Sequence, residues 1–196
     1  MTDIFSEYKF ILASKSPRRI ELIRMLGIEP LIRPSSIEEN AAKDDPEKMV
    51  KILAGQKASD ISRDLHGKEI VIGSDTCVWI NGEILGKPKT HEEAYLMVKK
   101  LSGNTHHVYT GVSIVSCEDR PRKISFVEKT AVRVRSISDE EIRSYAESPE
   151  PMDKAGAYGI QGIFARYIEG IDGDFYNVMG LPVSRLYHEL KEFIGR

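Results

Sequence analysis

The sequence contains few cysteines and no long hydrophobic run. Cys77 and Cys117 lack a CxxC spacing and stand in apolar, strand-like surroundings, so they indicate buried reduced thiols rather than disulfides or a zinc site. The longest apolar stretches, such as residues 70–72, fall far short of the ~20 residues that cross a bilayer. The amino terminus carries acids and lacks the apolar segment of a secretory signal. We therefore expect a cytoplasmic protein with no membrane partner.

An excess of one charge sign is also missing. The chain has 28 Lys plus Arg against 30 Asp plus Glu, a net charge of −2, and the two signs are interleaved along most of its length. This pattern disfavours a nucleic-acid partner. It does not exclude a small anionic substrate, because a few cations that converge in one cleft bind an anion whatever the net charge of the whole chain. The 196 residues suit one large domain or two lobes that share a core.

The first part of the chain alternates strand and helix signals. Ser16 suits the N-cap of a helix, Pro17 suits its first position, and Gly27 supplies a stop. The spacing of apolar residues indicates which segments are strands and which are helices. The predicted elements are a strand at 9–14, a helix at 17–26, a strand at 28–33 and a helix at 46–64.

The remainder of the chain continues the mixed pattern. Asn81-Gly82 predicts the turn of a hairpin, and Thr90 with Glu93 has the spacing of a capping box. The predicted elements are a buried strand at 69–80 interrupted by GSDT, a helix at 90–101, strands at 106–117 and 123–134, a helix at 138–146, two short strands after a glycine-rich stretch at 156–162, and a helix at 182–193. This order predicts the α/β class, with a mixed sheet flanked by helices.

The motif LASKSPRR stands where a strand ends and a helix begins. Helix amino termini present unpaired backbone N–H groups and a positive dipole end, which suit phosphate. Ser14 and Ser16 add hydroxyl donors, and Lys15, Arg18 and Arg19 add positive charge. Solvated cations are the alternative interpretation. However, cations at this end oppose the helix dipole by ~0.3–1 kcal/mol each, a cost that an anionic ligand would offset.

The motif GSDT places Asp75 inside an apolar strand. A carboxylate buried alone is costly, so charges at such places are usually paired or bound to metal. A capping or turn aspartate is the alternative. The carboxyl ends of strands are where α/β proteins collect ligands. Asp75 could therefore ligate a hard cation or act as a general base toward water.

The motif GKP holds Lys87 between Gly86 and Pro88, across the predicted hairpin from Asp75. The hairpin would return this lysine toward the same end of the sheet, and the stiff flanking backbone would orient it. A solvated lysine is the alternative.

Taken together, these motifs resemble the Maf family of nucleotide pyrophosphatases. The matching strings, in order along the chain, are LASKSPRR, IEEN, GQKA, GSDT, GKP, LSGNTH, KAGAYGIQG and GLPVSRL. The resemblance implies one Maf-like domain over residues 1–196, with an elongated, ITPase-like α/β fold and a cleft between two lobes. It implies hydrolysis of a nucleoside triphosphate to monophosphate and pyrophosphate, a divalent metal (Mg²⁺ or Mn²⁺) and a homodimer.

The resemblance also implies the residues of the site, in two groups. The catalytic group is Asp75, Glu39 and Lys87, of which Asp75 and Glu39 would hold the metal. The substrate-binding group is Ser14, Arg18, Arg19, Lys57 and Gln161.

The strings SPRR and AGAYGIQG resemble the branch of the family that prefers dTTP and UTP to 7-methyl-GTP. The Gln161 amide offers a donor and an acceptor to a uracil-type edge. Two other functions remain open. A non-catalytic nucleotide-binding regulator of cell division is disfavoured because a pure binder needs no water-activating carboxylate. A kinase or phosphatase is disfavoured, in its P-loop form, by the absence of GxxxxGK[ST].

Overall fold

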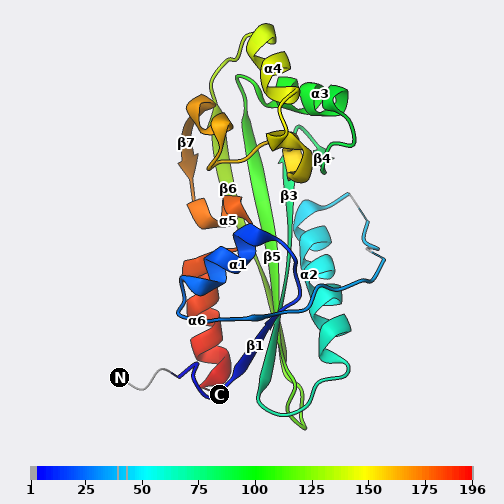
Figure 1. Ribbon diagram of the computed structural model, residues 1–196, viewed down its shortest axis with the longest axis vertical. Coiled ribbons are helices and arrows are strands. Elements are labelled where there is room, and N and C mark those ends of the chain that lie inside the picture. The colour runs from blue at the N-terminus through cyan, green and yellow to red at the C-terminus, as the bar shows by residue number, and fades with distance from the viewer. Residues whose placement is uncertain (1–3, 39, 43, 196) are drawn as a thin grey trace. The chain divides into compact units, whose positions relative to one another are not determined.

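The computed structural model describes residues 4–38, 40–42 and 44–195. Within them, seven strands form one sheet in the order β2-β1-β3-β5-β6-β7, with β4 paired to β3 (Figure 1). The strands are β1 (Lys9–Leu12), β2 (Leu31–Ile32), β3 (Glu69–Ile80), β4 (Glu83–Leu85), β5 (Thr105–Ser116), β6 (Lys123–Val134) and β7 (Ile168–Asp172). β1 pairs parallel with β2 and β3, whereas β3 with β4 and β6 with β7 are antiparallel. The sheet is therefore mixed, as predicted.

Helices flank these strands. They are α1 (Pro17–Arg24), α2 (Pro46–Ser62), α3 (His91–Leu101), α4 (Asp139–Ala146), α5 (Phe175–Met179) and α6 (Val183–Ile194), with 3-10 turns η1 (Glu150–Asp153), η2 (Ala155–Ala157) and η3 (Ile163–Tyr167). No helix in the described part of the chain is long and apolar enough to span a membrane. The α/β class with helices flanking a mixed sheet is confirmed.

The described residues divide into two compact units. The first contains the chain up to Asp75, Thr110–Glu128 and the chain from Gly180 onward, and the second contains Thr76–Tyr109 and Lys129–Met179. The chain passes from one unit to the other inside β3, β5 and β6. A single domain over residues 1–196 stays a prediction.

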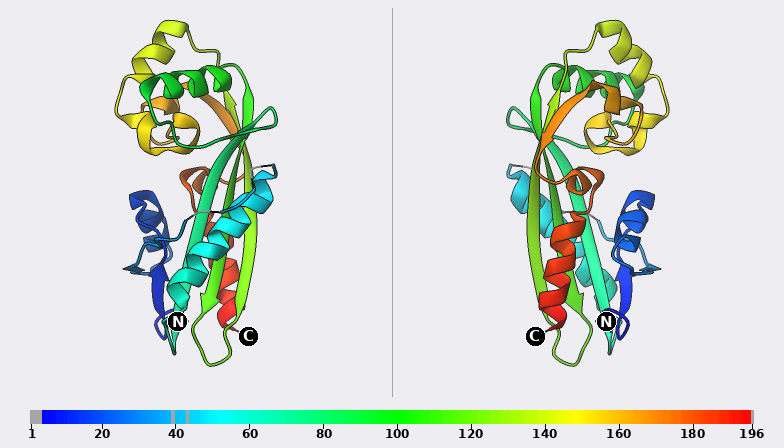
Figure 2. Two further views of the ribbon diagram at one scale, coloured as in Figure 1. Left: turned by 90° about the vertical axis from the view of Figure 1, so that its right-hand side faces the viewer. Right: turned by 90° about the vertical axis from the view of Figure 1, so that its left-hand side faces the viewer.

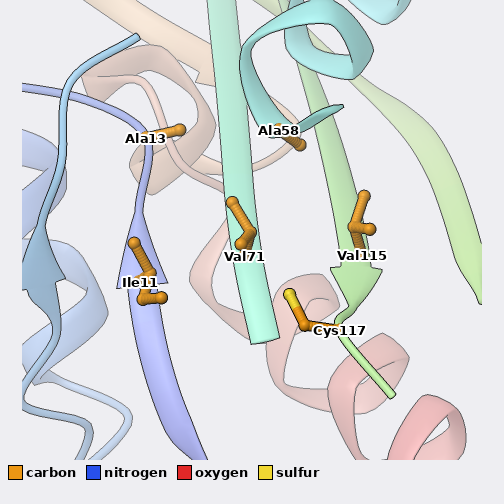
Figure 3. Packing of buried hydrophobic residues seen from close by; sticks show 6 residues of the cluster. All are labelled: Ile11, Ala13, Ala58, Val71, Val115 and Cys117. Carbon is orange, nitrogen blue, oxygen red and sulfur yellow. The ribbon is translucent and has the colours of Figure 1, made fainter. Parts of the chain in front are cut away.

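The core of the first unit lies where β1, β3 and β5 meet α2. Figure 3 shows Ile11, Val71 and Val115 from the three strands packed with Ala58 of α2 and with Cys117, all of them buried. Figures 1 and 2 agree that α2 and α6 lie on opposite sides of these strands. Cys77 and Cys117 are both buried and neither is in a disulfide, as predicted.

Two glycines let α2 approach the sheet closely. A Cβ atom at Gly73 of β3 would overlap the carbonyl oxygen of Ala54 and lie 2.8 Å from the backbone nitrogen of Ala58. A Cβ atom at Gly111 of β5 would overlap the carbonyl group of Val50. Because glycine has no Cβ, the helix backbone packs directly on both strands.

In the second unit, the predicted hairpin is confirmed. Asn81 and Gly82 both have positive φ, 50° and 82°, as a type I′ turn requires. Trp79 of β3 pairs with Ile84 of β4 on its return. Half of the predicted capping box is present. The Thr90 side chain accepts the N–H of Glu93 and starts α3, but the Glu93 carboxylate accepts the N–H of Lys89 instead of that of Thr90.

Three predictions about strands are wrong. β3 continues through GSDT without interruption, because the polar side chains of Ser74 and Asp75 both find partners there. The strand predicted at 28–33 is only Leu31–Ile32, since prolines on both sides lack the N–H that a sheet ladder needs. After the glycine-rich stretch there is one strand, β7, rather than two. Residues 163–167 form η3 instead, and α5 follows β7.

Candidate functional site

The SPRR loop begins at the carboxyl end of β1. The register pairs Leu12 with Ile72, so Ser14 and Ser74 stand at the same level of two parallel strands. The side chain of Ser14 is buried, and its Oγ accepts the N–H of Ser16 at 3.2 Å. This bond fixes the turn into α1. The predicted Pro17 start and Gly27 stop are both present, the latter with φ of 75°.

Arg19 joins three motifs that are distant in the sequence. Its Nη1 donates to the carbonyl oxygen of Ser74 at 2.9 Å and to Ser14 Oγ at 3.4 Å. Its Nε donates to the carbonyl oxygen of Gly180 at 2.9 Å, and Ser74 Oγ donates to the same oxygen at 3.1 Å. The guanidinium therefore ties SPRR to GSDT and to GLPVSRL. The carbonyl dipoles also compensate part of its unfavourable position at a helix amino terminus.

Arg18 lies half-buried at the second position of α1. The first turn of α1 contains no acidic residue, and its N-cap, Ser16, makes no side-chain capping bond. No acidic side chain in the first turn therefore balances the positive end of the helix dipole. An anion bound there would be stabilised by this end and by Arg18.

Lys57 and Asp75 form an ion pair in the same unit. The Nζ atom of Lys57 lies 2.6 Å from Oδ1 of Asp75, and the two side chains are only 15% and 14% exposed. Side chains alternate along a strand, so Asp75 shares the α2 side of β3 with Val71 and Gly73. The close approach of α2 at Gly73 places Lys57 beside the carboxylate.

Glu39 lies outside the described residues, so its predicted role stays a prediction. The following residue, Asn40, is attached to α2, where its carbonyl oxygen accepts a 2.8 Å hydrogen bond from the side chain of Gln56. Gln56 precedes Lys57 in the sequence.

Lys87 and Gln161 belong to the second unit, and both are exposed. The backbone N–H of Gly156 donates to the carbonyl oxygen of Gly86 at 2.9 Å, which connects the AGAYGIQG segment to GKP directly before Lys87. Gly156 has φ of 69°, and a Cβ atom there would lie 2.8 Å from a methyl group of Val78. Glycine thus allows this contact.

The structure joins Ser14 and Arg19, at the carboxyl end of β1, to the middle of β3, where Asp75 is paired with Lys57. It connects the segments that carry Lys87 and Gln161 within the other unit. That these two groups of residues form one site stays a prediction.

The donor set around Asp75 can be compared with the needs of a metal ion. Among the residues that the structure describes, no three His, Cys, Asp or Glu side chains are grouped as a metal cage would require. Mg²⁺ usually needs only one or two carboxylates, with waters and substrate phosphates completing its shell. One carboxylate at Asp75, which shares Oδ1 with Lys57, fits such an ion.

A separate hollow of about 500 Å³ lies at the amino end of β1. Its lining residues are Phe5, Ser6, Tyr8, Lys9, Phe10, Gly27, Ile28, Glu29 and Leu31. Open α/β sheets bind ligands at the carboxyl ends of strands, and Ser14 follows the carboxyl end of β1, at the level of Ser74 and Asp75 in the middle of β3. The hollow is therefore not the predicted site.

Sequence reasoning assigned no role to two residues that build the site. Gly180 supplies the carbonyl oxygen that receives both Arg19 and Ser74, and Gly73 admits α2. Both glycines belong to motifs that resemble those of the Maf family, GLPVSRL and GSDT. Their place in these motifs is the sequence signal that could have identified them.

A cationic loop that follows β1 and opens a helix, with a Lys–Asp pair on the neighbouring parallel strand β3, defines an α/β protein with a site suited to a phosphate-bearing ligand. The family model described as "Maf-like protein" matches residues 9–193. The chain belongs to the Maf family.

Curated relatives agree with this assignment. The chain is 46% identical to a "dTTP/UTP pyrophosphatase" of Clostridium perfringens, over 94% of this chain and 97% of the relative. It is 48% identical to a protein of the same name from Thermosipho melanesiensis, over 90% and 93%. A HAM1 protein from Coxiella burnetii has a TM-score of 0.54 at 14% identity, covering 94% of this chain and 99% of that one. The Ham1 protein of Staphylococcus aureus gives 0.51 at 14%, with the same coverages. These two structures show the likeness of the fold alone.

Proposed function

We propose that the protein hydrolyses nucleoside triphosphates at the α–β phosphoanhydride to monophosphate and pyrophosphate, with dTTP, UTP and modified pyrimidine nucleotides as substrates. The observation that carries this proposal is the largely buried Lys57–Asp75 pair beside the SPRR loop. The names of relatives that share almost half of their residues with the chain support the same reaction.

The residues of the first unit supply what phosphoanhydride cleavage needs. The reaction requires a water in line with the leaving group and neutralised charge on the phosphate oxygens. Ser14, Arg18 and the amino terminus of α1 bind phosphate oxygens, and Arg19 both holds the loop and contributes charge. Lys57 has three donors, so it can bind a phosphate oxygen while it remains paired with Asp75. Asp75 either accepts the proton of the attacking water or holds the metal ion.

The metal would be held by Asp75, with Glu39 as the second expected carboxylate. Mg²⁺ or Mn²⁺ at this place would neutralise charge on the phosphate oxygens. Its requirement is tested by assaying turnover after chelation and after each ion is returned separately.

The second unit would contribute Lys87 and Gln161. Lys87 would bind the pyrophosphate portion, and Gln161 would donate to and accept from the uracil-type edge of the base. A wrong base would leave such groups unpaired at a cost of ~1–3 kcal/mol each, enough for tenfold to thousandfold discrimination.

Product analysis tests the proposed reaction. We would incubate the protein with dTTP, UTP, CTP, GTP, 7-methyl-GTP and ATP at equal concentration, with Mg²⁺ and with Mn²⁺, and quantify monophosphate, pyrophosphate and orthophosphate. We expect equimolar monophosphate and pyrophosphate, with the highest kcat/KM for dTTP and UTP. Faster turnover of 7-methyl-GTP or ATP would contradict the substrate branch but not the reaction.

The same assay separates the two other functions. Orthophosphate as the product would indicate a phosphatase, and nucleotide binding without turnover would indicate a regulator of cell division. The Lys57–Asp75 pair favours the enzyme, because a carboxylate beside bound phosphates repels them unless it serves the chemistry.

We propose further that the enzyme works as a homodimer in the cytoplasm, in keeping with the family resemblance, without a nucleic-acid or membrane partner. The nearly balanced charge, net −2, supports the absence of a nucleic-acid partner. Light scattering on the purified protein tests the dimer, and a monomer mass would contradict it.

A further inference from the structure

The turn that presents Gln161 is short and tightly defined. The N–H of Gly162 donates to the carbonyl oxygen of Gly159 at 3.1 Å, so Ile160 and Gln161 are the two central residues of a four-residue turn. Gln161 itself is exposed, and η3 begins two residues later at Ile163. The direction of the Gln161 side chain therefore depends on what fixes the turn.

The carboxylate of Glu150 holds the end of this turn. Its Oε2 accepts the N–H of Ile163 at 2.7 Å, and its Oε1 accepts the N–H of Phe164 at 3.4 Å. The hydroxyl of Tyr145 donates to the same Oε1 at 3.0 Å. Hydrogen bonds to an ionised acceptor are shorter and stronger than neutral ones, so one side chain caps the amino end of η3 firmly.

Glycine at position 162 belongs to this arrangement. A Cβ atom there would overlap the carboxylate of Glu150, so only glycine lets Glu150 reach the backbone beyond the turn. Lys154 holds the other side of Glu150, because its Nζ donates to the Glu150 carbonyl oxygen at 2.6 Å. The position of Glu150 is thereby fixed through both its backbone and its side chain.

We infer that Glu150 is a positioning residue for substrate recognition, which orients Gln161 toward the nucleotide through the turn at residues 159–162. This inference rests on the proposed function for its substrate. In this role Glu150 needs no contact of its own with the nucleotide. It acts through Gln161, so the consequences of its loss depend on whether Gln161 is present.

The test is a double-mutant cycle with Glu150→Gln, Gln161→Ala and the double variant, and with Glu147→Gln as the matched control. Glu150→Gln keeps the size of the side chain but replaces one oxygen by an amide donor, which faces a backbone N–H. Glu147 is exposed on the same unit. kcat/KM for UTP is measured well below the melting temperature of each variant, and UMP affinity is measured by calorimetry.

We expect Glu150→Gln to lower kcat/KM for UTP by about tenfold to hundredfold, the usual effect of a misplaced binding group. In the Gln161→Ala background the same change should cost less than about threefold, since coupled residues are not additive. Glu147→Gln should match the wild type. Equal losses in both backgrounds would overturn the inference, because they would show a general structural role.

The two readouts separate this inference from the proposed function. Coupling of Glu150 to Gln161 in UMP affinity, without pyrophosphate release, would reject the enzyme and keep the positioning role. Pyrophosphate release with additive losses would support the enzyme and reject the positioning role of Glu150. Absence of both turnover and binding would reject both.

If Glu150→Gln does not fold, Tyr145→Phe takes its place in the cycle, because it removes one donor to the carboxylate and leaves the backbone bonds in place. The same pattern of coupling is expected from it, and additive losses would again overturn the inference.

Discussion

Lys57 of α2 and Asp75 of β3 are joined by a 2.6 Å ion pair whose side chains are 15% and 14% exposed. The pair exists because Gly73, two residues before Asp75 on the same face of the strand, lets the backbone of α2 lie against β3. Both charges are largely removed from water, so each depends on the other for its stabilisation.

Removal of Lys57 should destabilise the fold. Lys57→Met leaves Asp75 as a largely buried carboxylate without its cation, and we expect the free energy of unfolding to fall by about 3–5 kcal/mol. The double variant Lys57→Met/Asp75→Asn should lose less, because the charge is gone. Lys48→Met is the control, since its side chain is 80% exposed and its pair with Asp45 should contribute less than ~1 kcal/mol. Urea unfolding measures all three, and equal losses for Lys57→Met and Lys48→Met would contradict the account.

Substitution of Gly73 should separate α2 from β3. A Cβ atom at this place meets the backbone of Ala54 and Ala58, which cannot rotate away as a side chain can. We expect Gly73→Ala to cost about 1–3 kcal/mol of stability and to weaken UTP hydrolysis, because Lys57 moves with the helix. Gly86→Ala serves as the stability control, since nothing lies within 4 Å of a Cβ there. A Gly73→Ala protein as stable as Gly86→Ala would show that α2 does not rest on this glycine.

Lys87 should matter for the substrate and not for the fold. Its side chain is exposed, so Lys87→Ala should change stability by no more than about 0.5 kcal/mol. We expect kcat/KM for UTP to fall, because a phosphate-binding cation is lost. Lys89→Ala removes an exposed lysine two residues away and should leave the kinetics unchanged. A marked drop in melting temperature with unchanged kinetics would instead assign Lys87 a structural role.

His106 should make stability depend on pH below neutrality. It is fully buried, its Nε2 lies 2.7 Å from the hydroxyl oxygen of Tyr158, and burial lowers the pKa of His106 to about 4, with a smaller contribution from His107. Between pH ~6.5 and ~4 the unfolded chain therefore binds a proton at His106 that the folded chain does not. The free energy of unfolding should fall as pH falls through this window, by roughly 3 kcal/mol in all.

His106→Gln removes this group, so its stability should vary less between pH 4 and 7 than that of the wild type. Urea unfolding at several pH values gives the comparison. Parallel curves for the two proteins would show that His106 does not titrate as its burial requires.

Most of the helices, strands and turns could be predicted from residues that are close together in the sequence. The Ser16-Pro17 start and the Asn81-Gly82 turn depend on backbone preferences of the residues themselves, so the sequence predicts them directly. The segment at 163–167 was missed because its 3-10 turn is stabilised by the carboxylate of Glu150, which lies 13 residues before Ile163. No local pattern contains that interaction.

The sequence motifs predicted which residues belong to the site, but not the contacts that hold these residues together. The motifs name Ser14, Arg19 and Asp75, yet the bond from Arg19 to Gly180 joins residues 161 positions apart and depends on the completed fold. The Lys57–Asp75 pair similarly requires α2 to pack at Gly73. Contributions from Glu39, Lys87 and Gln161 to the same site remain predictions.

Pyrophosphate release from UTP by the wild type and by Asp75→Asn, measured side by side with saturating UTP and Mg²⁺, tests the central claim most directly. Asp64→Asn, at an exposed carboxylate of the same unit, is the control. We predict one pyrophosphate per UTP consumed by the wild type and by Asp64→Asn, and turnover lower by about 10²–10⁴ for a folded Asp75→Asn protein. Undiminished pyrophosphate release by folded Asp75→Asn would contradict the account.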